Sequence, residues 1–259
     1  MKDTNGLSSY ERRQQLLRWI ERNGRISVAQ ICEHFGVSEA TARRDLEALA
    51  EEGNIQRVHG GAILIRQAPP EPPLFQRERE QFLEKQRIGQ AAAALVQDGE
   101  TIFLASGTTT LAVAYHLRSR HNLTVITNSL PVMNVLANEP GITLIGIGGM
   151  LRQSELSFIG HIAEQAIAEL RADKVFIGIY ALSLEQGLTS DYLPEILTDR
   201  AILKIGREVI LVADHTKFGR VSSALVAPLA SVHRIVTDSA APPDMVETLR
   251  QMDIDVILA

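Results

Sequence analysis

The sequence predicts an α/β protein with an N-terminal winged helix-turn-helix and a C-terminal doubly wound, mostly parallel β-sheet. Three observations support this prediction. Three short amphipathic helical patterns and a hairpin pattern occupy residues 1–66, and the Pro-rich stretch QAPPEPPLF occupies residues 67–75. Across residues 76–259, short apolar runs alternate with helical patterns. Because 259 residues suffice for about two domains, we expect a small domain, a linker and a larger domain with these boundaries.

The N-terminal segment holds helical patterns that end at glycines. Apolar residues recur at helical spacing in each pattern, and Ser38 is a good N-cap. The helices are expected at Tyr10–Asn23, at Val28–Phe35, and from Ser38 to Gly53. Two apolar runs, Ile55–Val58 and Ala62–Ile65, flank His59-Gly60-Gly61 and predict a β-hairpin. Helices followed by a hairpin predict a winged helix-turn-helix.

The third helix carries small and polar side chains opposite its apolar face. Arg44 can donate two hydrogen bonds to a guanine, and Ala40 or the methyl group of Thr41 can contact a thymine methyl. Arg43 and Arg57 suit phosphates, which position a protein without specifying sequence. An ordinary amphipathic helix with solvated arginines is the alternative, which the following hairpin disfavours. The apolar face holds Ala42, Leu46 and Leu49, and the candidate DNA-binding residues are Ser38, Ala40, Thr41, Arg43, Arg44, Arg57 and His59.

Composition limits where a polyanion can bind. The net charge of −5 divides into +1 for residues 1–66 and −6 for residues 67–259, so only the N-terminal segment suits DNA. The single cysteine, Cys32, excludes a disulfide framework, and the histidines show no metal-ligand spacing. No apolar run reaches the length that spans a bilayer, and the first ten residues are polar, so we expect no secretory signal. We expect a cytoplasmic protein with no metal, no cofactor and no membrane partner.

The larger domain begins with a helical pattern at about Glu80–Gln97 and continues as alternating strand and helix patterns. This rhythm is typical of a parallel sheet covered by helices on both faces. The strands are expected at Thr101–Ala105, Leu123–Thr127, Ile142–Ile147, Lys174–Ile179, Val209–Ala213, Arg234–Thr237 and Val256–Leu258.

Gly- and hydroxyl-bearing turns follow the earlier strands. Ser106-Gly107-Thr108-Thr109-Thr110 joins a strand to a helix start, and such a loop can hold an anion with backbone N–H groups and hydroxyls. Serine and threonine are also simply good N-caps, which is the alternative. Comparable turns occur at Thr127-Asn128-Ser129 and Gly148-Gly149. Because the carboxyl ends of parallel strands meet at one edge of a sheet, we expect a ligand site there.

Two long runs of residues resemble a known family. The stretch from Val37 to Leu46, followed by Arg57-Val58-His59-Gly60-Gly61-Ala62, resembles the N-terminal signature of the DeoR/GlpR family of bacterial repressors. Ala42 stands where an isoleucine is usual in that signature. Because Ala42 is on the apolar face, we expect this difference to affect the packing of the helix more than its recognition of DNA bases. The segments Leu156–Gly160, Gly187–Thr189 and Ala213–Gly219 resemble the sensor domain of the same family, so the resemblance extends from Glu11 to Asp238.

The resemblance implies a repressor of a carbohydrate-metabolism operon that binds an operator in double-stranded DNA. It implies control by a small, phosphorylated or acidic sugar-related effector, and a sensor fold similar to sugar-phosphate isomerases and CoA-transferases. We also expect a homo-oligomer, a dimer or a tetramer, because one small winged domain offers few phosphate contacts. The candidate effector-binding residues are Ser106, Gly107, Thr108, Thr109, Ser129, Gly149, Tyr180, Glu195 and Lys217.

Two positions in the sensor domain also depart from the family pattern. Ala105 and Tyr180 stand where the family has acidic residues, so two carboxylates that could hold sugar hydroxyls or move protons are missing. Tyr180 is a donor to a ligand oxygen rather than a base. We therefore expect an effector with fewer hydroxyls, or more negative charge, than a simple sugar phosphate. The alternative function is a sugar-phosphate isomerase-like enzyme with an appended DNA-binding domain, which the single remaining Glu195 disfavours.

Overall fold

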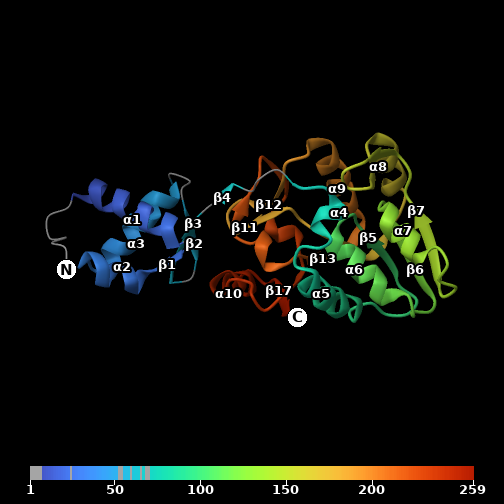
Figure 1. Ribbon diagram of the computed structural model, residues 1–259, viewed down its shortest axis with the longest axis horizontal. Helices are drawn as coiled ribbons and strands as arrows, with labels where there is room; N and C mark the ends of the chain where they lie inside the picture. The colour runs from blue at the N-terminus through green and yellow to red at the C-terminus, as the bar shows by residue number, and fades with distance from the viewer. Residues whose placement is uncertain (1–7, 24, 52–54, 59, 65, 68–70) are drawn as a thin grey trace.

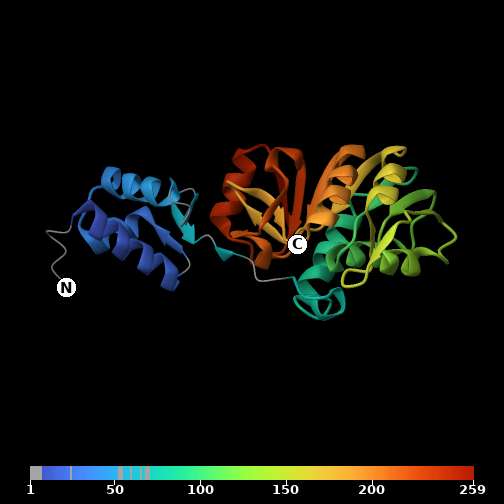
Figure 2. The ribbon, with the colours of Figure 1, turned by 90° about the horizontal axis from the view of Figure 1, so that it is seen from above.

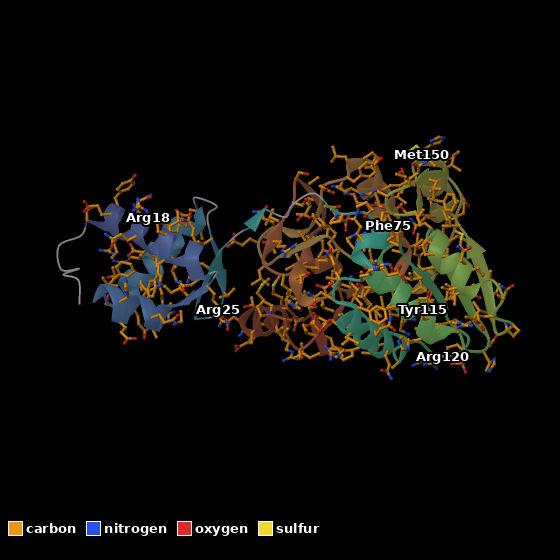
Figure 3. The ribbon with its side chains drawn as sticks, viewed as in Figure 1. Arg18, Arg25, Phe75, Tyr115, Arg120 and Met150 are labelled. Carbon is orange, nitrogen blue, oxygen red and sulfur yellow. The ribbon has the colours of Figure 1, made fainter. Side chains whose placement is uncertain are left out.

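The computed structural model describes residues 8–23, 25–51, 55–58, 60–64, 66–67 and 71–259. Figure 1 shows a small helical body at the N-terminal end and a larger α/β body beyond it. Arg25 faces the larger body and forms an ion pair with Asp244 (Figure 3). The two-part organisation thus follows the expected order along the chain.

The N-terminal helices form close to the predicted positions. The helices are α1 (Ser9–Asn23), α2 (Val28–Phe35) and α3 (Glu39–Glu51). Ser27 and Gln30 form a reciprocal capping box at the start of α2, and Ser38 Oγ accepts the Thr41 N–H at 3.3 Å to cap α3. Gly36 ends α2 with φ of 66°, a left-handed conformation that glycine adopts without strain. The caps therefore set the turn between α2 and α3.

A small antiparallel sheet completes the N-terminal body. Its strands are β1 (Arg25–Ser27), β3 (Gly61–Leu64) and β2 (Ile55–Val58), in that order. The hairpin β2–β3 is confirmed, whereas β1 was not predicted because three residues carry no readable alternation. A Cβ atom at Gly61 would lie 2.1 Å from the Ile26 carbonyl oxygen, so β1 and β3 can pair only with glycine there. The apolar faces of the three helices are buried against this sheet.

The larger body is built on a parallel sheet of seven strands, and each predicted strand forms one of them. In spatial order they are β17 (Asp255–Leu258), β16 (Arg234–Thr237), β13 (Gly206–Val212), β10 (Ala172–Ile177), β5 (Thr101–Leu104), β6 (Leu123–Thr127) and β7 (Ile142–Gly146). Every neighbouring pair is parallel. The chain starts at β5, builds one side through β6 and β7, and returns through β10 to build the other. This doubly wound order creates a crevice beyond the carboxyl ends of β5 and β10.

Helices cover both faces of the sheet, as Figure 2 shows from above. One face packs on α5 (Phe82–Ala93), α6 (Thr108–Leu117) and α7 (Leu130–Leu136). The opposite face packs on α8 (His161–Ala168), α9 (Leu193–Ile205) and α10 (Pro243–Gln251). Residues along β5 alternate between the two cores: Ile102 and Leu104 face α5 and α6, and Phe103 faces the other side.

Several short elements around the sheet were not predicted. The hairpin β8 (Met150–Arg152) and β9 (Ser157–Ile159) precedes α8. A small sheet joins β11 (Ala181–Ser183), β12 (Gly187–Ser190) and β15 (Ala224–Ala227). The expected linker contributes to regular structure at both ends: Gln67 belongs to β4 (Arg66–Gln67), which pairs with β14 (Arg220–Val221), and Leu74 begins α4 (Leu74–Arg77).

Candidate functional site

A cleft opens at the crevice of the doubly wound sheet. Its walls come from the loops after β5, β10 and β13, from α9, and from the segment that precedes and includes α4. The empty volume, counted with the open mouth, is about 580 Å³. The lining residues with polar side chains are Glu71, Arg77, Ser106, Thr108, Thr109, Glu155, Tyr180, Ser190, Glu195, Asp199 and Lys217.

The loop after β5 presents the start of α6 to the cleft. Gly107 has φ of 129°, which favours glycine, and the Leu111 N–H donates to the Gly107 carbonyl at 3.0 Å as the first helical bond. The N–H groups of Thr108 and Thr109 therefore precede the helical ladder and point outward from its start. An α-helix N-terminus carries partial positive charge. Together with the hydroxyls of Thr108 and Thr109, it makes a site suited to an anion.

Glu195 of α9 connects several side chains around the cleft. Ser157 Oγ donates to its carboxylate at 2.6 Å, and Ser106 Oγ donates to the same oxygen at 3.4 Å. Arg152 forms an ion pair with the other carboxylate oxygen, and its guanidinium lies 4.2 Å from the centre of the Tyr192 ring. Glu195 is thus fully partnered and orients the Ser106 loop.

Arg77 lies at the base of the cleft between two carboxylates. Its guanidinium is 2.8 Å from Glu71 and forms a second ion pair with Glu155, and it donates to the Pro72 carbonyl at 2.8 Å. All three side chains are at most 10% exposed. Burial raises the pKa of Glu155 to about 7 and also raises the pKa of Glu71, while the positive charge of Arg77 opposes both shifts.

Three further groups complete the lining. Burial lowers the pKa of the Lys217 ammonium, which lies 5.3 Å from the centre of the Tyr180 ring. The Tyr180 hydroxyl is buried without a hydrogen-bond partner among the described residues, and burial raises its pKa to about 12. Burial, together with the charges of Glu195, Glu155 and Glu71, raises the pKa of Asp199 well above its usual value. An unpartnered tyrosine hydroxyl is a donor ready for a ligand oxygen.

The expectation that Glu195 is the one carboxylate left at the site is wrong. Glu71, Glu155 and Asp199 also line the cleft. Glu71 precedes α4, Glu155 lies in the β8–β9 turn, and Asp199 lies in the second turn of α9. These three segments are far apart in the sequence, so no sequence pattern indicates that their carboxylates are neighbours. Arg77 and Arg152 were missed for the same reason. The only available signal was that Glu71 lies within the Pro-rich stretch and that Arg77 follows it by two positions.

The structure brings most of the predicted effector contacts together, but not Ser129 and Gly149. The predicted contacts that line the cleft are Ser106, Gly107, Thr108, Thr109, Tyr180, Glu195 and Lys217. Ser129 is buried and caps α7 by accepting the Val132 N–H at 3.4 Å. Gly149 has φ of 148° and packs so that a Cβ atom would lie 2.8 Å from the Ile159 carbonyl oxygen. Capping and close packing account for both residues without a ligand.

The third helix, α3, presents the expected two faces. Ala42, Leu46 and Leu49 are buried, and Ala40, Arg43 and Arg44 are exposed. Asp45 is also buried, which the helical wheel did not predict. Arg12 of α1 clamps its carboxylate with two hydrogen bonds, of 2.6 and 3.1 Å, and so ties α1 to α3.

The arginines around α3 differ in their partners. Arg57 is 2.6 Å from Glu47, and Arg43 is 3.3 Å from Glu39. Within the described ranges, Arg44 makes no ion pair and is exposed, so its guanidinium is available for a partner. His59 lies outside the described residues. Across the part of the chain that is described, no group of three or more histidine, cysteine, aspartate or glutamate side chains could hold a metal ion, and no helix could cross a membrane.

Comparisons with known proteins agree with this arrangement. The DeoR-like helix-turn-helix model matches residues 12–68, and the DeoR C-terminal sensor model matches residues 80–239. The chain is 34% identical over 248 residues to the glycerol-3-phosphate regulon repressor of Escherichia coli (strain K12), covering 96% of this chain and 98% of that protein. It is 34% identical over 233 residues to the transcriptional repressor AccR of Agrobacterium fabrum (strain C58), covering 90% of each.

Solved structures with partial likeness include ribose 5-phosphate isomerase A of Methanocaldococcus jannaschii, with a TM-score of 0.40 and 16% identity over 54% of this chain and 55% of that one. The family matches, by contrast, span both bodies of the structure, with the helix-turn-helix match on α1–α3 and the sensor match on the sheet that carries the cleft. The chain therefore belongs to the DeoR family of DNA-binding transcriptional repressors, with a DeoR-like helix-turn-helix domain followed by a DeoR sensor domain.

Proposed function

We propose that this protein represses a carbohydrate-metabolism operon in the cytoplasm, and that a small phosphorylated or acidic sugar-related effector controls it. Residues 1–66 are the DNA-binding domain, residues 67–75 the linker and residues 76–259 the sensing domain. The observation that carries the proposal is the cleft, where the N-terminus of α6, Arg77 and Lys217 line the same open space. Relatives named as repressors of a glycerol-3-phosphate regulon support the class of effector.

The anionic group of the effector binds at the loop Ser106–Thr109. Backbone N–H groups and hydroxyls there can donate several hydrogen bonds, and Lys217 supplies a charge from the facing wall. The buried Tyr180 hydroxyl donates to an oxygen farther along the molecule.

The variant Thr109→Asp tests this assignment. It places a carboxylate where the anion would lie, so like-charge repulsion should abolish the response to the effector. DNA affinity without effector should stay within about threefold of the wild-type value, because α3 is unchanged. The measurement is DNA affinity by fluorescence anisotropy in the presence of a panel of phosphorylated sugars, sugar acids and polyols.

The matched control is Thr143→Asp, which adds the same charge on the exposed face of edge strand β7. It should respond to the effector as the wild type does. An effector response that survives in Thr109→Asp would remove this loop from the site.

Aldose–ketose isomerisation is the second candidate function, and the carboxyl groups at the cleft favour it. It requires a base beside the carbon and an acid beside the carbonyl oxygen. Glu71, Glu155 and Glu195 are instead held in ion pairs with arginines. We expect no ketose from ribose 5-phosphate and related aldose phosphates. Turnover that disappears in Glu195→Gln would make the protein an enzyme.

A further inference from the structure

The segment that joins the two domains contributes a carboxylate to the effector cleft. Glu71 lies four positions after Gln67, the last residue of β4, and its side chain is 10% exposed. It lines the same cleft as Ser106, Thr109 and Lys217. The other carboxylates of the cleft, Glu155, Glu195 and Asp199, belong to the sensing domain itself. Glu71 is thus the one lining carboxylate, among the described residues, that the connecting segment supplies.

Cationic groups hold Glu71 in this position. Arg77 binds its carboxylate at 2.8 Å, and the positive charges of Lys217 and Arg152 also attract it. The Glu71 N–H donates to Asp191 Oδ2 at 3.2 Å, and three residues later the Leu74 N–H donates to the Ser154 carbonyl at 2.8 Å. The carboxylate therefore uses the cations that an anionic effector would need.

We propose that Glu71 is an internal competitor of the effector's anionic group, and that its displacement transmits effector binding to the DNA-binding domain. This inference rests on the proposed function and names the regulation of the same site. An incoming anion takes over the positive charge of Arg77 and Lys217, and it repels the Glu71 carboxylate. Arg77 remains in place because Glu155, which belongs to the β8–β9 turn, still holds its guanidinium.

The path from Glu71 to the DNA-binding domain is short. β4 pairs with β14, whose first residue, Arg220, lies three positions after Lys217. Strand β3 of the N-terminal hairpin β2–β3 ends at Leu64, two positions before β4 begins. Both residues of β4 pair with β14, and β4 lies between Glu71 and the hairpin β2–β3 along the chain. Releasing Glu71 therefore frees the chain on one side of β4 and changes the freedom of the DNA-binding domain.

The alternative is that the Glu71–Arg77 ion pair has a purely structural role. Phosphate affinity distinguishes this role from competition with the effector. Glu71→Gln keeps the size of the side chain and removes its charge. Inorganic phosphate is the probe, titrated calorimetrically into the full-length wild type and variant. We expect about tenfold tighter phosphate binding by Glu71→Gln, because a competing carboxylate at the same cations is removed. The control Glu78→Gln removes an exposed carboxylate seven positions away and should bind phosphate as the wild type does.

Hydrogen exchange of the wild type reports the displacement directly and does not depend on how the variant folds. Phosphate should speed exchange of the Glu71 and Leu74 amides, whose acceptors are Asp191 and Ser154. Amides of β5 should not change. In Glu71→Gln, exchange of the same two amides should already be fast without phosphate.

The outcomes separate the inference from the function. Equal phosphate affinity of wild type and Glu71→Gln, with unchanged exchange at Glu71, would overturn the inference and leave the anion site standing. Phosphate binding by neither protein at tens of millimolar would overturn the anion site and the inference with it. Tighter phosphate binding by Glu71→Gln than by the wild type, or faster exchange of the Glu71 and Leu74 amides when phosphate binds to the wild type, supports the inference.

Discussion

Glu155 shows how strongly the cleft perturbs its own side chains. Its pKa of about 7 in the folded protein exceeds the ordinary value of 4.5, chiefly because the carboxyl is buried. The folded state therefore binds more protons than the unfolded state between these pH values, so its stability falls as pH rises through this window. Below pH 4.5 both states are protonated and the contribution is complete.

This behaviour predicts the effect of Glu155→Gln. The free energy of unfolding of the wild type should fall relative to that of the variant, by on the order of 2–3 kcal/mol, between about pH 4.5 and pH 7.5. Urea denaturation at several pH values measures both. Glu247→Gln, an exposed carboxylate of α10, should track the wild type. Parallel pH profiles for wild type and Glu155→Gln would show that Glu155 titrates normally.

Arg44 is the residue that we expect to read a base. Arg44→Ala should weaken binding to the operator by about 1–3 kcal/mol and relax specificity at one position, because a bidentate contact to guanine is lost. Arg57→Ala should instead weaken binding to all sequences and flatten the salt dependence, because one phosphate contact and its counterion release are lost. Gel-shift titrations on operator and random duplexes measure both effects.

The control for Arg44 is Arg18→Ala, which removes an exposed arginine from α1 (Figure 3). An unchanged operator affinity in Arg44→Ala, or an equal loss in Arg18→Ala, would show that the register of the reading helix is wrong.

At the residue scale, the sequence predicts side chains that act within one element. The helical spacing of α3 correctly predicts that Ala42, Leu46 and Leu49 are buried and that the arginines opposite them are exposed, but it does not predict the burial of Asp45. Asp45 is buried because Arg12, 33 positions earlier, supplies its charge partner. The cleft carboxylates Glu71, Glu155 and Asp199 could not be predicted for the same reason. Each depends on partners that only the tertiary fold brings near.

At the scale of elements, the contact of α5 with α6 positions the loop Ser106–Thr109, where we expect the anionic group of the effector to bind. A Cβ atom at Gly89 of α5 would lie 2.7 Å from the backbone of Ala112 in α6. Gly89→Ala should therefore push the two helices apart and lower the free energy of unfolding by about 1–3 kcal/mol. It should also weaken the effector response, because α6 begins at the loop. Thermal and urea denaturation measure the first effect.

Gly148→Ala is the matched control, because a Cβ atom there meets no atom within 4 Å. Its stability should stay within about 0.5 kcal/mol of the wild-type value. A Gly89→Ala protein as stable as wild type would mean that α5 and α6 can separate without cost.

Long elements are predicted well, and short ones are not. The central strands of the parallel sheet are mostly buried, so they appear as continuous apolar runs that differ from helical patterns. Strands β1, β8, β9 and β11 have three residues each, too few for any periodicity. The expected helix at Glu80–Gln97 is shorter, Phe82–Ala93, because Gln81 takes a left-handed conformation and the chain turns before Gln97.

At the scale of the whole molecule, we expect a homo-oligomer of at least two copies. One domain with net charge +1 can neutralise few phosphates, so two copies on a repeated or palindromic site are needed for tight binding. Light scattering at working concentration measures the mass, which should be at least twice the 28.5 kDa of the chain. A monomer with full operator affinity would contradict this expectation.

The central claim is that one molecule couples an anion in the sensor cleft to DNA affinity. An operator selected from random duplexes by the protein itself is titrated by fluorescence anisotropy with and without each compound of the effector panel. At least one phosphorylated or acidic sugar-related compound should change operator affinity about 5- to 150-fold in the wild type, and leave Thr109→Asp unchanged. Sequence-specific DNA binding that no compound alters, or an equal response in Thr109→Asp, would contradict the account.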